Sequence, residues 1–125
     1  MPINNRGLSG QPILPYVDYR SYQGADVFID LTFLDHTGAL VTPSTFSYQI
    51  DDMTNSLSIV PATSVAVTGS TQTLRLLGSV FQLSHNWQGS EIWQISMKAV
   101  LPDGSTVMGV TILELLAIQV PNGSL

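Results

Sequence analysis

Alternating apolar and polar residues dominate the chain from residue 26 onward. Apolar residues occupy every second position in the segment 26–35, DVFIDLTFLD, and the segment 45–52, TFSYQIDD, repeats this pattern. Because successive side chains of a strand point to opposite faces, a period of two predicts strands with one buried face. Shorter runs that fit strands are LSIV at 57–60, TSVAVTG at 63–69 and TQTLRLLG at 71–78.

The clearest unit is the segment 91–120, EIWQISMKAVLPDGSTVMGVTILELLAIQV. Its first half places Trp93, Ile95 and Met97 on one apolar face. The Asp-Gly pair at 103–104 then supplies the positive φ that a hairpin turn needs. The leucines of the second half would also fit one face of a helix. The hairpin context and the Val-Thr-Ile lead-in favour a second long strand instead.

Roughly six to eight short strands, with turn signals about every 8 to 12 residues, are typical of an all-β sandwich or barrel. The irregular segment 78–90 is the place where one turn of helix fits. We therefore expect a single antiparallel β-sandwich over residues 25–120. An arm of residues 1–24 precedes it, and a short tail of residues 121–125 follows it.

The arm, residues 1–24, lacks the alternation and contains three prolines, which predicts an extended segment. Near its end, Tyr16, Tyr19 and Tyr22 recur at every third position, so they share one side of a polyproline-like segment. Tyrosine buries well while one end stays polar. The three rings can anchor the arm on a neighbouring subunit, and they can equally pack on their own domain. The sequence leaves both alternatives open.

Composition favours a protein that contacts other proteins. A chain of 125 residues is one domain's length and buries about two-thirds of its unfolded surface. Only 10% of its residues are charged, against about a quarter in typical domains. A polar surface without charges suits close protein contact, because charges are costly to bury. With a net charge of −5 and only four Lys and Arg residues, binding to a phosphate backbone is not expected.

Several other classes of site are excluded by what the sequence lacks. The chain has no cysteine, which removes disulfides, thiol nucleophiles and thiolate metal sites. No apolar run reaches about 18 residues, so we expect no membrane span. The first residues, MPINNRGLSG, lack a basic region followed by an apolar stretch, so we expect no secretory signal. We also expect no cofactor and no metal.

The stretch 48–56, YQIDDMTNS, gathers acidic and amide residues that suggest a metal loop or an acid/base pair. Adjacent residues of a strand point to opposite faces, so Asp51 and Asp52 cannot act together on one substrate. A calcium loop also needs a glycine and a distal glutamate, and DDMTNS has neither. The stretch instead predicts a strand corner, where Asp and Asn side chains bond their own backbone.

Catalytic chemistry has few other candidates. Asp35 and His36 precede a Thr-Gly pair and fit a β-turn better than a catalytic dyad. His85 lies far along the chain, and no third ligand completes a zinc site. Nothing such as G-x-S-x-G marks an activated serine, and no Gly-rich phosphate loop is present. We therefore expect a protein that is not an enzyme. Trp87 is either a surface contact residue or a plug at one end of the sandwich.

Several segments together resemble the small immunoglobulin-like virion proteins of tailed bacteriophages. They are DVFIDLTF, DHTGALVTP, YQIDDMTN, TLRL and EIWQISMKAVLPDGS, and the resemblance covers about residues 26–118. It implies an immunoglobulin-like sandwich without a disulfide and a structural, non-enzymatic role. The family offers no fixed functional residues to carry over. The same rhythm of strands and turns occurs in bacterial surface immunoglobulin-like and fibronectin-like modules.

The function expected from these observations is that of a capsid cement or decoration protein in a virion assembled in the host cytoplasm. Its partners would be the major capsid protein or other virion subunits, in a homo-oligomer or repeated assembly, with no nucleic acid or membrane. The residues expected to bind the partner are Pro12, Ile13, Leu14, Tyr16, Tyr19 and Tyr22 of the arm, with Trp87 as a possible surface contact.

Three alternatives stay open. A neck, tail or baseplate component is a close variant of the virion role. A carbohydrate- or surface-binding module would use Trp87 with Asn86 and Gln88. A small hydrolase would use His36 or His85, with an Asp or Ser within hydrogen-bond reach.

Overall fold

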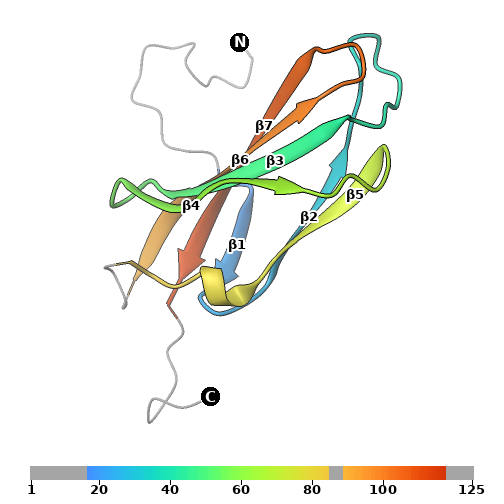
Figure 1. Cartoon of the computed structure of the whole chain (residues 1–125). Helices are drawn as coiled ribbons and strands as arrows, with labels where there is room; N and C mark the ends of the chain where they lie inside the picture. Colours follow the sequence, from blue (N-terminus) through green and yellow to red (C-terminus); the bar gives the residue numbers. More distant parts are fainter. Residues whose placement is uncertain (1–16, 85–88, 118–125) are drawn as a thin grey trace, which may run out of the picture.

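Two β-sheets pack face to face in the computed structural model, which describes residues 17–84 and 89–117 (Figure 1). One sheet has five strands in the order β1-β7-β6-β3-β4, and the other has two strands, β2 and β5. The predicted all-β sandwich is confirmed. The elements are β1 (Tyr19–Tyr22), β2 (Val27–Thr32), β3 (Thr45–Asp52), β4 (Leu57–Val65), β5 (Thr71–Leu76), a 3₁₀ turn (Gly78–Val80), β6 (Ser90–Val100) and β7 (Thr106–Leu116).

The core lies between the two sheets, where the alternating apolar residues meet. Burial alternates strictly along β6, so Trp93, Ile95 and Met97 all point inward, as the sequence predicts. Phe46 of β3 packs edge-on against Phe33, with ring centroids 5.4 Å apart. The remaining buried apolar residues are Val27, Ile50, Leu74, Leu76, Phe81, Ala99, Leu101, Leu113 and Leu115.

The predicted hairpin of β6 and β7 forms the longest pairing in the molecule, from Ser90↔Leu116 to Val100↔Thr106. Gly104 takes a φ of +89°, the left-handed conformation that glycine adopts without a steric penalty. The Asp103 carboxylate accepts bonds from the backbone N–H and the hydroxyl of Ser105. These bonds hold the pKa of Asp103 below its ordinary value. The leucine-rich second half is a strand through Leu116, and residues 118–120 of that segment lie outside the described residues.

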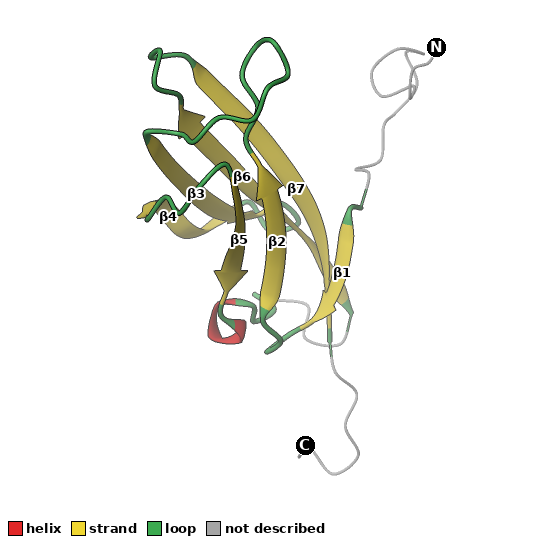
Figure 2. Cartoon of the chain, turned by 90° about the vertical axis from the view of Figure 1, so that its right-hand side faces the viewer, coloured by secondary structure: helices red, strands yellow, loops and turns green. Residues whose placement is uncertain are grey.

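The end of the predicted arm belongs to the sandwich, which corrects the boundary placed between residues 24 and 25. Tyr19–Tyr22 form β1, which pairs in parallel with Leu113–Leu116 of β7 in an otherwise antiparallel sheet. Figure 2 shows this short strand at the edge of the large sheet. It carries no apolar alternation because its residues are mostly exposed. The hydrophobic pattern therefore could not reveal it.

Asp26, just before β2, forms hydrogen bonds with residues at the end of β5 and at the start of the 3₁₀ turn. Its carboxylate accepts bonds from Arg75, with Nη2 at 2.8 Å, and from the backbone N–H of Gly78 at 2.7 Å. The Arg75 hydrogen bond is the main cause of a pKa of Asp26 below its ordinary value, and the bond from Gly78 adds to it. The 3₁₀ turn thus sits directly against the chain that links β1 to β2, because the Gly24 N–H also bonds the Phe81 carbonyl at 2.9 Å.

Candidate functional site

The stretch 48–56 is the corner between β3 and β4, as its sequence predicts. Asp51 points outward and accepts a bond from Gln49 Nε2 at 3.1 Å, whereas Asp52 is buried on the opposite face. The backbone N–H of Asn55 donates to Asp52 Oδ1 at 3.1 Å, and Ser56 turns the chain with a φ of +55°. The two aspartates therefore face away from each other and cannot act on one substrate.

A buried polar network lies behind this corner. The Asn55 side-chain amide donates to Asp52 Oδ2 at 2.8 Å and to Glu91 Oε2 at 2.9 Å. Glu91 Oε1 accepts the indole N–H of Trp93 at 3.1 Å and the backbone N–H of Ser84 at 2.9 Å. Asp52 is fully buried and Glu91 is 1% exposed. One hydrogen-bond network thus connects the β3–β4 corner and the segment before β6 to β6 itself.

This network was missed by the sequence reasoning, which gave Glu91 no role. One feature of the sequence could have indicated its burial. Glu91 lies two residues before Trp93 and four before Ile95, so on a strand its side chain points inward as theirs do. Its oxygens are occupied by donors from the fold, and it is closed off from solvent. The hollow in the outer face of the large sheet, described below, is lined by other residues. The geometry assigns the network to stability rather than to chemistry on a ligand.

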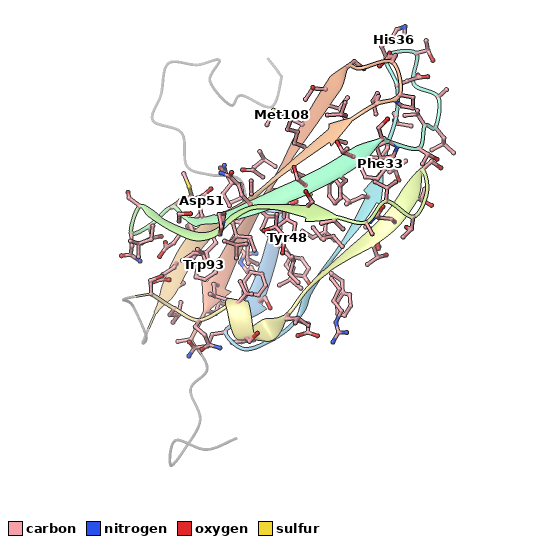
Figure 3. The ribbon with its side chains drawn as sticks, viewed as in Figure 1. Phe33, His36, Tyr48, Asp51, Trp93 and Met108 are labelled. Atoms are coloured by element: carbon pink, nitrogen blue, oxygen red, sulfur yellow. The ribbon has the colours of Figure 1, made fainter. Side chains whose placement is uncertain are left out.

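The predicted turn at Asp35 and His36 is also confirmed. The Asp35 carboxylate accepts the backbone N–H groups of Thr37 at 2.8 Å and Ala39 at 3.0 Å, together with the Thr37 hydroxyl. The Thr37 hydroxyl bond is the largest cause of a pKa of Asp35 below its ordinary value, and the two backbone bonds reinforce it. His36 is exposed at the tip of its loop, at the far end of the sandwich from Trp93 (Figure 3).

The alternative of histidine or metal chemistry, which the sequence does not favour, finds no further support in the described residues. In residues 17–84 and 89–117, no three His, Asp or Glu side chains are grouped to hold a metal ion. His85 and Trp87 lie outside the described residues. So do four of the predicted arm contacts: Pro12, Ile13, Leu14 and Tyr16. The other two, Tyr19 and Tyr22, are 38% and 54% exposed on the edge strand β1.

The surface best placed to bind a partner is the face of the large sheet that points away from β2 and β5, which we call the outer face. Most of its β3 and β6 positions are serine and glutamine, which alternate with the inward apolar residues, and Asp51 and Lys98 are the charged residues at the outward positions of these two strands. Met108 and Val110 form its apolar border on β7, at 72% and 52% exposed. The outer face consists of Ser47, Gln49, Asp51, Gln94, Ser96, Lys98, Met108 and Val110.

A hollow of about 380 Å³ lies in this face, and its lining includes Ser47, Gln49, Ser96, Lys98 and Met108. The strand register places Gln49 opposite Ser96 and Ser47 opposite Lys98. The alternation of apolar and polar residues in the sequence already predicted that these polar side chains point away from the core. Whether they form a broad hollowed surface depends on the order β7-β6-β3-β4, which the sequence did not settle.

The five-stranded sheet and the two-stranded sheet pack together as an immunoglobulin-like β-sandwich. This class is typically non-catalytic. No helix in the described part of the chain is long and apolar enough to cross a membrane.

Comparison with solved structures agrees with this class. The fold is similar to the crystal structure of the periplasmic chaperone SfaE, with a TM-score of 0.52 and 12% identity over 84% of this chain and 56% of that one. Thus the chain spans little more than half of the SfaE chain, and at this identity the likeness shows the fold alone. It is also similar to murine CRIg, with a TM-score of 0.42 and 13% identity over 88% of this chain and 100% of that one. No family model matches the sequence, and no curated protein matches it.

Proposed function

We propose that this chain is a non-enzymatic structural protein of a phage virion, most specifically a capsid cement or decoration protein that binds the outer shell. The observation that carries the proposal is the outer face. It is broad, most of its β3 and β6 positions are serine and glutamine, and its β7 border exposes Met108 and Val110. The resemblance of residues 26–118 to phage immunoglobulin-like proteins supplies the virion setting.

The chemistry of the outer face suits contact with another protein subunit. The centres of protein interfaces are depleted in charged residues, because a charge without a partner is costly to bury. Gln49 and Ser96 offer hydrogen-bond donors and acceptors at a lower desolvation cost than ions. Met108, which lines the hollow, adds exposed apolar area. On a shell with many identical sites, weak contacts of this kind add up by avidity when subunits are linked.

The alternatives have less support from the described residues. A neck, tail or baseplate component would use the same face for the same reason and is a variant of the proposal. The carbohydrate-binding alternative relies on Trp87, Asn86 and Gln88, which lie outside the described residues. The hydrolase alternative loses Asp35 as a partner for His36, because the Asp35 carboxylate is engaged with its own turn.

Charge and bulk in the middle of the outer face are expected to weaken partner binding strongly. The variant Ser96→Arg places a guanidinium between Gln49 and Val110, the two residues that face Ser96 across β3 and β7. We expect affinity for shells stripped of this protein to fall at least about tenfold, because a buried charge without a partner is strongly unfavourable. Co-sedimentation with phage particles from the host that carries the gene measures this.

The matched control is Ser79→Arg, which adds the same side chain at an exposed position of the 3₁₀ turn. It should bind as the native protein does. Equal binding by both variants would show that the outer face is not the contact surface. Equal loss by both would show that added positive charge, and not its position, weakens binding.

A further inference from the structure

The large sheet has an open edge along the first half of β7. On one side, β6 pairs with the whole of β7, from Thr106 to Leu116. On the other side, β1 pairs only with Leu113–Leu116 and lies beside one end of the longer strand (Figure 2). In the part of the chain that the structure describes, no strand pairs with this side of residues 106–111. We call this segment the open edge.

Hydrogen bonds at both ends of the open edge fix the direction of its backbone groups. The N–H of Ile112 bonds Asp18 Oδ2 at 2.8 Å, and its carbonyl accepts the Asp18 N–H at 2.9 Å, so both groups point away from β6. The Ser105 carbonyl accepts the Leu101 N–H and points to the β6 side. The register with β6 has no shift in between, and backbone groups alternate in direction along a strand. The even-numbered residues from 106 to 110 therefore turn their N–H and C=O groups to the open edge.

The opposite edge of the same sheet, at β4, carries features that prevent a further strand from pairing. β4 contains Pro61, and its pairing with β3 has register shifts. Proline and bulges are among the devices that keep edge strands from adding another strand. The open edge, TVMGVT at 106–111, has neither, and it has no charged residue. Of these two edges, the open edge is the one suited to strand addition.

Apolar surface lies on both sides of the open edge. On the inner side, a hollow of about 190 Å³ is lined by core residues, among them Phe33 and Met97. Gly109 borders this hollow and has no side chain to fill it. An engineered apolar cavity of about 150 Å³ holds benzene, so the hollow has room for one large apolar side chain. On the outer side, Met108 and Val110 are exposed.

The charge beside the open edge is positive and has no counterion. Lys98 is exposed, is the register neighbour of Met108 on β6, and borders the same hollow. Among the described residues, Arg20 and Arg75 form ion pairs, and Lys98 forms none. A residue of an added strand opposite Met108 would lie two strand spacings from Lys98, about 10 Å. An extended lysine and a glutamate side chain span that distance together.

We propose that the protein bound by the outer face contributes an extended segment that pairs with the open edge as an added strand. The segment carries a large apolar residue opposite Gly109, which enters the hollow, and an acidic residue opposite Met108, which meets Lys98. Directly opposite residues of paired strands lie on the same face, so each side chain is on the side that its contact requires. The inference rests on the proposed function, because it describes how that same partner docks.

A second copy of this chain fits the open edge less well. Antiparallel self-pairing that uses every outward backbone group of the open edge must be centred on Met108. Gly104 and Ile112 lie four residues to either side of this centre, so the copy's hairpin turn would face Ile112. Asp18 already occupies that place. A free extended segment can end before Ile112 and meets no such obstacle.

The test is a proline at position 108, where the N–H points to the open edge and away from β6. Met108→Pro removes this N–H, which an edge position tolerates, whereas the control Met108→Ala loses only the side chain. We expect Met108→Pro to bind stripped shells at least about tenfold more weakly than Met108→Ala, because its ring also obstructs an added strand. Co-sedimentation measures binding, and urea unfolding shows that both variants are folded. Lys98→Gln should bind about threefold more weakly than the native chain, and unchanged binding would overturn the acidic position.

Hydrogen exchange supplies a readout that needs no variant. In the free native chain the amides of Met108 and Val110 should exchange fast, and shell binding should slow them at least about tenfold, since paired amides are protected. The amides of Val107 and Gly109 point to β6 and should stay slow in both states. Slow exchange of Met108 and Val110 in the free chain would show that the chain itself or a second copy covers the edge, and would overturn the inference.

Failure of this inference can be told from failure of the proposed function. If the native chain does not bind shells, the proposed function is wrong, and the added strand falls with it. If the native chain binds, but Met108→Pro binds as well as Met108→Ala does, the added strand alone is wrong. Binding that leaves the exchange of Met108 and Val110 unchanged leads to the same conclusion.

Discussion

Replacing Gly78 by alanine is expected to destabilise the fold by about 3 kcal/mol or more. The new methyl group would clash with the backbone of Gly24, which cannot move without disrupting its neighbours. A Cβ on Gly78 would stand 2.1 Å from the carbonyl oxygen and 2.6 Å from the carbonyl carbon of Gly24. This clash can be relieved only if the segment between β1 and β2 moves away from the 3₁₀ turn. That movement would stretch the bond from the Gly78 N–H to Asp26. Urea unfolding followed by tryptophan fluorescence measures the loss.

Two other glycines supply graded controls for this prediction. Gly69→Ala should be nearly neutral, because its closest neighbour would be the Thr71 carbonyl oxygen at 3.6 Å and its φ is not positive. Gly104→Ala meets open space but keeps a φ of +89°, which costs an alanine about 1–2 kcal/mol. A Gly78 variant no less stable than the Gly69 variant would contradict the close contact between the turn and the link.

Replacing Glu91 by alanine is expected to lower the free energy of unfolding by about 3–5 kcal/mol, because each buried donor left without an acceptor costs about 1–3 kcal/mol. The change leaves the Trp93 indole N–H, the Ser84 N–H and one Asn55 donor without their acceptor. It also opens a cavity beside Trp93. Equilibrium unfolding in urea measures the loss, and near-ultraviolet circular dichroism reports whether Trp93 stays packed.

The matched control for Glu91 is Glu114→Ala on β7. Glu114 forms an ion pair with Arg20 at 2.7 Å, in which the arginine side chain is 66% exposed. Exposed pairs contribute roughly 0–1 kcal/mol, so this variant should remain close to the native stability. If the two alanine variants lost the same stability, the buried hydrogen bonds of Glu91 would not stabilise the fold more than an exposed ion pair does, contrary to what their geometry indicates.

The alternation of apolar and polar residues predicted the long strands because their inner faces meet the core. Trp93 and Ile95 on β6 follow this pattern without exception. β1 was missed because an exposed edge strand of four residues needs no apolar face. Its partner in the sheet, β7, lies about ninety residues later in the chain, so local sequence could not indicate the pairing.

In the candidate site, too, the local features could be predicted from the sequence and the contacts between distant segments could not. The turns at Asp35 and Asp52 were predictable, because short polar side chains bonding their own backbone are a local effect. The meeting of Asp52 with Glu91 was not, because it joins residues from separate strands through Asn55. A buried carboxylate also contradicts the rule that charges stay outside. The outer face needed the order of the strands, which arises from tertiary packing.

The central claim is that this chain is a structural component of a phage particle, and its most direct test is the composition of that particle. Quantitative mass spectrometry of purified particles from the host that carries the gene, with immunogold labelling of intact ones, gives copy number and location. We expect a fixed number of copies per shell, labelled on the outside of intact particles. Absence of the chain from purified particles, with abundant chain in the rest of the lysate, would contradict the claim.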